Sequence, residues 1–402
     1  MKLTAGHLTY CTNIYAGETW AEHFEALKFS FPDIKSQLSP DAPMGIGLRL
    51  SNTASIEILQ GDNLIQFKQW LQINEGYVFT MNGFPYGNFH NVVVKDQVHA
   101  PDWTTKDRTA YTIRLFNILA HLLPEGMDGG ISTSPLSYKY WFNGDTTLKT
   151  AKIEATNNIL KVAAELYKIK LHTDITLHLD IEPEPDGILE TGREFIDWYE
   201  SMLLPQGIAF FNDEFQLPAA TAQQIIKEYI NLCYDVCHFA IGYEPHELII
   251  NELTQKGIKV GKIQISAALK AKFATSGHDR QMIKTEFKKF NEPTYLHQVI
   301  ARLADGTLLR YSDLPEALAT TDDPQEWRAH FHVPVFLENF GLLQSTQSDI
   351  VNVLALQAQN SFTNHLEVET YTWGVLPDAL KIPLTQSVIR ELEWVKNKLI
   401  NQ

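Results

Sequence analysis

The sequence alternates short runs typical of β-strands with longer segments whose apolar residues recur every three or four positions. The clearest strand pattern is 175–182 (ITLHLDIE), in which apolar and polar residues alternate, and a long helical pattern covers 150–168. This alternation is typical of parallel βαβ units, in which each helix returns the chain across the sheet. We therefore expect an α/β protein built on a parallel sheet.

The strand patterns continue to the carboxyl end of the chain. We expect strands at 8–13, 44–51, 77–82, 130–134, 175–182, 231–237, 260–266 and 366–371. One (β/α)₈ TIM barrel, with insertions after strands five and seven, explains this order and the length of 402 residues better than two domains. The prediction is a single barrel domain over 1–402, with an inserted region at about 270–328 that holds a basic helix (282–290) and a hairpin (299–312).

The composition indicates in which cell compartment the protein works and which class of partner it binds. With 33 basic and 48 acidic residues, the formal net charge is −15, which repels phosphate backbones and disfavours nucleic acid as a partner. Three cysteines are too few for a disulfide framework, and neither a signal peptide nor a membrane-spanning run is evident. We expect a cytoplasmic protein without a membrane partner. The basic helix is a solvated face, a phosphate contact or a homodimer contact.

Polar residues gather where the later strands end, and the carboxyl ends of strands carry the chemistry of such barrels. The candidates are Asp180, Glu182, Asp235, His238, Gln264, Glu367 and Glu369, together with His330 and His332 on one face of a strand in the insertion. Carboxylates and imidazoles that converge from separate strands form the usual cage for a divalent metal. The sequence therefore predicts one such ion, which could be Mn, Zn, Fe, Co or Mg.

Each candidate also has a structural explanation. A carboxylate at a strand end, such as Asp180, can cap the following helix, and the two histidines of the insertion can be structural. Glu184 and Asp186 in the PEPDG turn are expected to be solvated loop residues. Cys233 and Cys237 are expected to be small buried hydrophobes and not thiolate ligands.

The segment 233–243 (CYDVCHFAIGY) resembles the sixth-strand motif of xylose-isomerase-like TIM barrels, nearest to the form of the endonuclease IV branch. This resemblance implies that Asp235 binds metal with His238 beside it. It also implies that Glu182, on the preceding strand, and Glu369, on the last strand, complete the cage.

Two departures from that pattern matter. Strand seven presents Gln264 where the family has a histidine ligand, and His332 with His330 could compensate. The early histidines of the three-zinc endonuclease site have no match, which favours one metal and a small-molecule substrate over DNA. Nearly the whole chain is similar to the EboE group of this superfamily, which is named for metabolite traffic. The similar stretches are GHLTYCTNI, PMGIGLRLS, FTMNGFPYG, ISTSPLSYK, LDIEPEPDG, HFHVPVF and VETYTWGVLP.

The first hypothesis is a divalent-metal-dependent isomerase or epimerase for a sugar or similar metabolite. The metal would chelate a carbonyl and an adjacent hydroxyl, while Glu182 and Glu369 exchange the proton as general bases. The expected substrate-binding residues are His238, Asn82, Phe84 and Tyr86. The alternatives are a non-catalytic metabolite-binding or traffic protein that keeps the metal site, and a metal-dependent hydrolase related to endonuclease IV.

Overall fold

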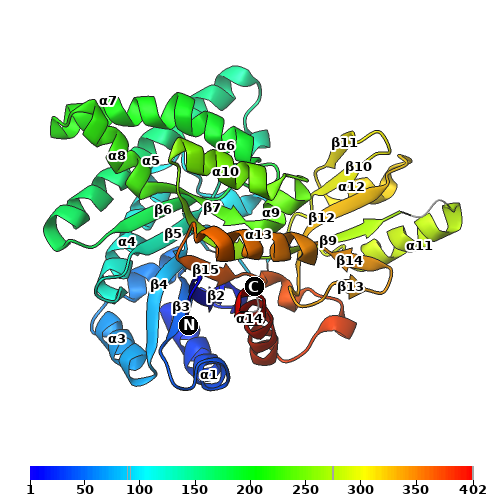
Figure 1. Cartoon of the computed structure of the whole chain (residues 1–402), viewed down its shortest axis with the longest axis horizontal. Helices are drawn as coiled ribbons and strands as arrows, with labels where there is room; N and C mark the ends of the chain where they lie inside the picture. The colour runs from blue at the N-terminus through cyan, green and yellow to red at the C-terminus, as the bar shows by residue number, and fades with distance from the viewer. Residues whose placement is uncertain (88, 91, 274–275, 401–402) are drawn as a thin grey trace.

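The first sheet of the computed structural model, which describes residues 1–87, 89–90, 92–273 and 276–400, is a nearly closed barrel (Figure 1). Its order is β1-β2-β15-β8-β7-β6-β5-β4-β3, and all strands but β1 (Lys2–Leu3) run parallel. The parallel strands are β2 (Gly6–Tyr10), β3 (Met44–Arg49), β4 (Gly76–Asn82), β5 (Gly129–Thr133), β6 (Leu177–Ile181), β7 (Ile230–Asp235), β8 (Val260–Ile265) and β15 (His365–Val368). A bridge between Cys11 and Gly47 joins the two edges. The predicted barrel and its strand positions are confirmed.

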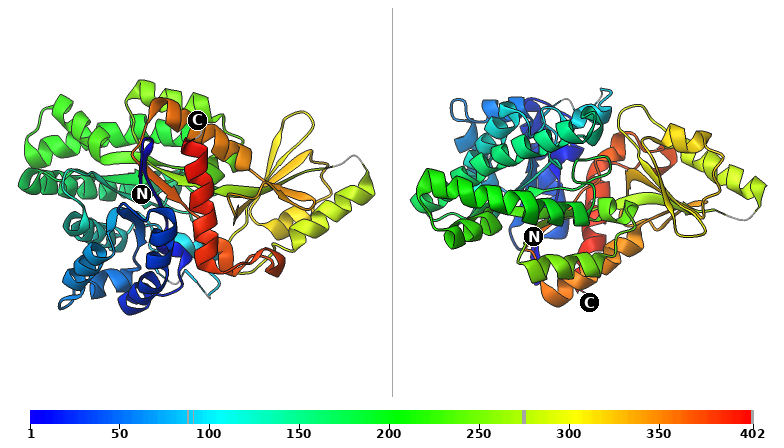
Figure 2. Two further views of the ribbon diagram at one scale, coloured as in Figure 1. Left: turned by 60° about the horizontal axis from the view of Figure 1, so that its bottom comes forward. Right: turned by 90° about the horizontal axis from the view of Figure 1, so that it is seen from above.

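Helices surround the barrel (Figures 1 and 2). They include α1 (Trp20–Leu38), α3 (Asn63–Ile73), α4 (Lys106–Leu122), α5 (Asp145–Thr173), α8 (Ala219–Tyr229), α10 (His246–Lys256), α13 (Gln347–Asn360) and α14 (Leu384–Ile400). Two helices, α2 (Asn52–Glu57) and α3, follow β3 in the chain. The start of α1 shows local control by sequence, because Thr19 and Glu22 form a reciprocal capping box. No helix in the described part of the chain has both the length and the apolar character needed to cross a bilayer.

A six-stranded antiparallel sheet lies between β8 and β15 in the sequence and beside the barrel in space (Figure 1). Its strands are β9 (Ala267–Lys272), β10 (Val299–Arg302), β11 (Leu308–Tyr311), β12 (Glu326–Val333), β13 (Asn339–Phe340) and β14 (Leu343–Ser345), with α11 (Gly277–Lys288) and α12 (Leu314–Ala319) beside them. The expected hairpin at 299–312 forms as β10 and β11. The division of 1–402 into one domain with an inserted region at 270–328 stays a prediction.

The pairing of β12 with β9 is interrupted between Ala329 and His332. An irregularity of this kind re-aims the side chains of a strand and is common beside functional sites. Through β12, the second sheet brings His330 and His332 to the carboxyl end of the barrel, where both are buried.

The barrel interior is charged. The Lys262 ammonium, on β8, is fully buried and donates to Glu367 Oε1 of β15 (3.0 Å), to the Met81 carbonyl of β4 (3.0 Å) and to Ser132 Oγ of β5 (3.1 Å). One side chain thus joins four strands across the barrel. Gly47 on β3 leaves room for this pair, since a Cβ there would lie 2.0 Å from Glu367 Oε2.

Replacing Lys262 by methionine should lower the free energy of unfolding by roughly 3–5 kcal/mol, because it leaves the Glu367 carboxylate buried without its partner. Lys259→Met is the matched control, since Lys259 pairs with Glu228 on the surface and such pairs contribute less than about 1 kcal/mol. Urea denaturation of both variants measures the difference. Equal losses would show that the barrel does not depend on the buried pair.

Candidate metal centre

Three buried carboxylates meet at the carboxyl ends of the barrel strands. Glu182 directly follows β6, Asp235 is the last residue of β7, and Glu369 directly follows β15. One oxygen of each lies within 4.8 Å of the others. The structure thus brings together the three carboxylates that the sequence predicted as ligands.

Neighbouring side chains hold one oxygen of Asp235 and of Glu369 in place. Glu369 Oε1 accepts hydrogen bonds from Asn13 Nδ2 (2.7 Å) and Asn82 Nδ2 (2.8 Å). Asp235 Oδ1 accepts from Ser266 Oγ (2.7 Å) and from the backbone N–H of His238 (3.1 Å), so it also caps the following helix α9 (Val236–Ile241). Asp235 Oδ2 and Glu182 Oε2, both buried, have no partner among the described residues. Buried polar atoms without a partner are costly, and a bound cation would satisfy both.

The charges of the cluster also favour a bound cation. Burial, and then repulsion from neighbouring carboxylates, raises the pKa of Glu182 and of Glu369 well above their usual value. Burial raises the pKa of Asp235 as well, while His332 opposes the rise. Like charges this close disfavour joint ionisation, and a divalent metal ion would reverse that balance.

His332 has the geometry of a metal ligand. Its Nδ1–H donates to the backbone carbonyl of Glu369 (3.1 Å), which directs the lone pair to Nε2. That Nε2 is buried and has no hydrogen-bond partner among the described residues, and His332 belongs to a group with Asp235 and His238 whose ligand atoms lie within 4.8 Å. Burial lowers the pKa of His332 to about 4, so the ring is neutral near pH 7. A neutral imidazole fixed through its other nitrogen is the usual form of a histidine ligand.

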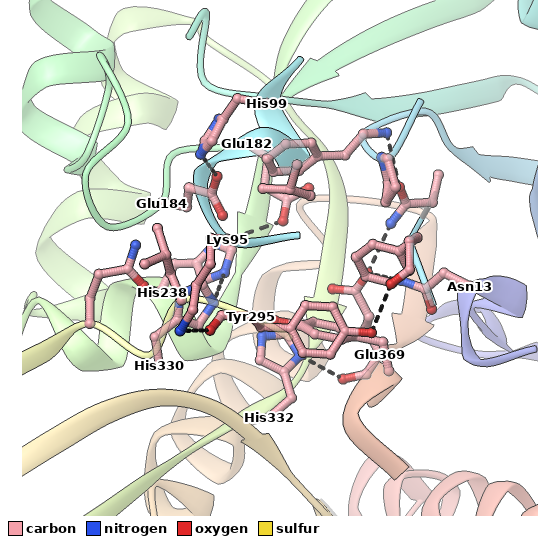
Figure 3. Close-up of a pocket in the computed structure, with 18 residues that line it drawn as sticks. Asn13, Lys95, His99, Glu182, Glu184, His238, Tyr295, His330, His332 and Glu369 are labelled. Atoms are coloured by element: carbon pink, nitrogen blue, oxygen red, sulfur yellow. Dashed lines mark hydrogen bonds and ion pairs between the residues drawn. The ribbon is translucent and has the colours of Figure 1, made fainter. Parts of the chain in front are cut away.

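His238 and His330 face each other beside this cluster (Figure 3). His238 Nδ1 lies 3.0 Å from the Pro183 carbonyl, and His330 Nδ1 lies 2.9 Å from Gln298 Oε1. Both Nδ1 atoms must donate to these oxygens, so the Nε2 atoms, 3.1 Å apart, both carry lone pairs. Burial lowers the pKa of His238 to about 3 and that of His330 well below 6.5. A shared cation makes this contact favourable, and a Glu184 oxygen lies within 4.8 Å of both rings.

Glu184 and Asp186 are not solvated, and this corrects the expectation for the PEPDG turn. They are only 6% and 5% exposed. The turn folds back on the barrel, where Gly187 pairs with Tyr138, and His99 Nε2 lies 3.1 Å from Glu184 Oε1. Burial raises the pKa of Glu184 well above its usual value.

A cavity of about 60 Å³ lies against these side chains. Of the predicted substrate-binding residues, Asn82, Phe84 and His238 line it. Tyr86 does not, because its ring packs on Tyr111 with a centroid distance of 4.9 Å. Sequence reasoning missed further lining residues, namely Lys95, His99, Tyr295 and Tyr371 (Figure 3 labels the first three). Lys95, His99 and Tyr371 lie in 3-10 helices of five and four residues and Tyr295 lies in a loop, so no periodic pattern marks these positions as buried.

Gln264 is fully buried on β8 but does not line the cavity. Its Oε1, the atom that would bind a metal, accepts from Cys233 Sγ at 2.6 Å. The Gln264 oxygen is therefore already bonded to Cys233, although Gln264 is the neighbour of Asp235 across β7 and β8. A buried imidazole beside Asp235 comes from His332, on β12.

No family model matches the chain, and no curated protein matches it. Among solved structures, the chain is similar to the IolI protein with a bound zinc atom, at 10% identity and a TM-score of 0.50, with 98% of each chain covered. It is also similar to a xylose isomerase-like TIM barrel protein from Mycobacterium smegmatis in complex with magnesium, at 9% identity and a TM-score of 0.50, over 99% of this chain and 97% of the other. At this identity the likeness shows the fold alone, which is that of a xylose isomerase-like TIM barrel. The resemblance to the EboE group is not confirmed by these comparisons.

Asp235→Asn should release about one equivalent of divalent metal, because the variant keeps the shape of the side chain but loses the charge that the cage supplies. Metal analysis of the purified protein by emission spectrometry measures the loss. Glu244→Gln is the matched control, since burial raises the pKa of this carboxyl to about 8 and it lies outside the cluster, on the Gly192 backbone. Unchanged metal content in Asp235→Asn would overturn the ligand assignment.

Metal affinity should rise as the pH rises. The raised pKa values of Glu182 and Glu369 mean that both carboxyls hold protons in the metal-free protein that the ion must displace. Titration with a metal-sensitive dye between pH 5 and pH 8 measures the slope. Glu182→Gln should flatten that slope, and an equal slope in both proteins would contradict the argument.

Proposed function

We propose that the protein is a divalent-metal-dependent isomerase or epimerase of a sugar or a sugar-like metabolite. The observation that carries the proposal is that two buried carboxyls, Glu182 and Glu369, line one cavity together with His238 and Asn82. Two carboxyls at one cavity can act as the base that takes a proton from a substrate and the acid that returns one. The resemblance to the EboE group suggests that this metabolite is a small precursor that is exported or handled in a pathway.

Glu182, Asp235, Glu369 and His332 are the proposed ligands of the metal ion. When bound, the ion supplies a Lewis acid that polarises a carbonyl and an adjacent hydroxyl of the substrate. Support for this set comes from the unpartnered atoms Glu182 Oε2, Asp235 Oδ2 and His332 Nε2, which are buried and belong to groups within 4.8 Å.

The two glutamates differ in how they are held, and this suggests a division of roles. Glu182 Oε2 has no hydrogen-bond partner among the described residues, so this carboxyl is free to turn toward a substrate carbon and take a proton from it. Glu369 Oε1 is fixed by Asn13 and Asn82, so this carboxyl keeps one orientation while it returns a proton. Transfer between two such groups gives an isomer or an epimer.

The rest of the cavity suits a small polar molecule with apolar faces. Phe84, Phe89, Tyr295 and Tyr371 supply aromatic walls, and Asn13, Asn82 and His238 supply polar groups. Lys95 Nζ is already bound to the Tyr295 carbonyl and to Asp313 Oδ2, each at 2.7 Å. This lysine therefore shapes the wall, and its charge is already paired.

A metal-dependent hydrolase is the second candidate, and one observation favours it. The opposed Nε2 atoms of His238 and His330, with Glu184, offer donors for a second cation next to the first cluster. Paired metal ions are typical of hydrolytic sites. A non-catalytic metabolite-binding protein would keep the same residues without turnover.

Glu369→Gln should reduce turnover by about 10²–10⁴-fold while changing ligand affinity only a few-fold, because it removes a proton-transfer group but keeps the shape. The measurement is the exchange of substrate carbon-bound hydrogen with deuterated water, followed by NMR over a panel of aldoses and ketoses at saturating metal. Glu244→Gln is again the control.

Three outcomes separate the candidates. Exchange that is lost in Glu369→Gln, while the variant still holds its metal ion by emission spectrometry, supports the isomerase. Binding of a sugar without exchange in the wild type overturns it in favour of a metabolite-binding protein. Cleavage of a phosphoester or glycoside without exchange overturns it in favour of a hydrolase.

A further inference from the structure

A second group of metal-binding side chains lies at the opposite, amino-terminal end of the barrel strands. Asp128 directly precedes β5, His178 is the second residue of β6, and His365 is the first residue of β15. One ligand atom of each lies within 4.8 Å of the others. The proposed function uses none of these residues.

The spacing of their atoms fits ligands that share one ion. Asp128 Oδ2 lies 3.7 Å from His178 Nε2 and 3.5 Å from His365 Nε2. Both distances exceed those of ordinary N–H···O hydrogen bonds, which are 2.7–3.2 Å. Two ligands bound to tetrahedral zinc at about 2.0–2.1 Å each lie about 3.3 Å apart. The two gaps are therefore slightly wider than two ligands on one zinc ion require.

His178 is oriented as metal-bound histidines are. Its Nδ1–H donates to Asp180 Oδ1 at 2.7 Å, and Asp180 is fully buried. This bond leaves the lone pair on Nε2, the atom that faces Asp128. A carboxylate behind the histidine in this way fixes its tautomer and makes it a better donor.

His365 supplies an independent sign of a missing partner. The residue is 1% exposed, yet neither of its ring nitrogens has a hydrogen-bond partner among the described residues. Buried nitrogens are normally satisfied. An ion held with Asp128 would satisfy Nε2.

The surrounding strands leave space for this arrangement. A Cβ on Gly261 would lie 1.8 Å from Asp180 Oδ1, and a Cβ on Gly130 would lie 2.3 Å from His178 Cε1. These two glycines of β8 and β5 thus make room for the His178–Asp180 pair. A cavity of about 220 Å³, lined by Asp128 and His178 among others, gives an ion a route to the group.

The competing explanation is an ion pair without metal. Burial lowers the pKa of His178, but Asp180 and Asp128 raise it to about 9, so in the absence of a metal the ring carries a proton toward Asp128. This pair accounts for His178. It leaves the second imidazole, His365, buried 3.5 Å from the same oxygen and without a hydrogen bond.

We propose that Asp128, His178 and His365 bind a zinc ion at the amino-terminal end of the barrel, with water from the cavity as fourth ligand. Two imidazoles and one carboxylate are a donor set that zinc prefers. The ion joins β6 and β15, two strands that are not neighbours in the sheet. Its role is to stabilise the barrel at the end remote from the carboxylate cluster.

The test uses the full chain with Asp235→Asn and His330→Asn as background, so that the carboxylate cluster and the group of Glu184, His238 and His330 are both disabled. Cobalt is the probe, because tetrahedral Co²⁺ replaces zinc and absorbs visible light. We expect about one equivalent of cobalt with tetrahedral absorption, and an increase in melting temperature on addition of zinc. Asp128→Asn, a partly exposed and isosteric change, should abolish both signals, and Asp180→Asn should weaken binding by about 10–100-fold.

His7→Asn is the matched control. His7 lies at the same end of the barrel, but its Nδ1 is 2.8 Å from the Tyr77 hydroxyl and it is outside the group. Circular dichroism checks that each variant is folded. Cobalt bound by the background protein and by His7→Asn, but not by Asp128→Asn, supports the proposal. A background protein that binds no cobalt, or an Asp128→Asn variant that binds it unchanged, overturns the proposed zinc site. Neither result bears on the proposed isomerase activity.

Discussion

The contact between Lys262 and Glu367 is the interaction around which the barrel is arranged. The interiors of (β/α)₈ barrels are mostly filled by branched apolar side chains, but here a fully buried ammonium and a fully buried carboxylate lie 3.0 Å apart. Taking both charges out of water is costly, and the cost is offset only when each group is fully bonded. The bonds from Lys262 to Met81 and Ser132 meet that need for the ammonium, and they require β4, β5, β8 and β15 to hold fixed positions.

The same lysine influences the carboxylate cluster above it. It opposes the rise in the pKa of Glu182 and of Glu369, but it does not overcome burial and the mutual repulsion of the carboxyls. One cation already paired with Glu367 cannot also neutralise three further carboxylates. A divalent ion at the carboxyl ends of the strands is therefore the natural complement of this interior, since it adds the missing positive charge where the unpartnered oxygens lie.

The sequence predicted those strands and site residues that a local periodicity or a local motif marks. The alternation in 175–182 predicted β6, and the CYDVCHFAIGY motif predicted the position of Asp235 at the end of β7. Sequence reasoning failed for Glu184, because a PEPDG stretch looks like a solvated turn until Tyr138 and His99 pack against it. Sequence reasoning also could not predict the group of Asp128, His178 and His365, because only closure of the barrel brings β6 near β15.

Strands β6 and β15 carry residues of both candidate cation sites and of the buried charges between them. On β6 and just beyond it, His178, Asp180 and Glu182 are two residues apart, and so are His365, Glu367 and Glu369 on β15. Because side chains alternate along a strand, each set of three lies on the same side of its strand, inside the barrel. Each strand therefore presents a histidine at one end, a carboxylate in the middle and a carboxylate at the other end. The middle carboxylates are held within the protein, Asp180 by His178 and Glu367 by Lys262. Among the outer groups, Glu182 Oε2 and both ring nitrogens of His365 have no hydrogen-bond partner among the described residues, so each end of the barrel interior holds a buried atom that a cation would satisfy.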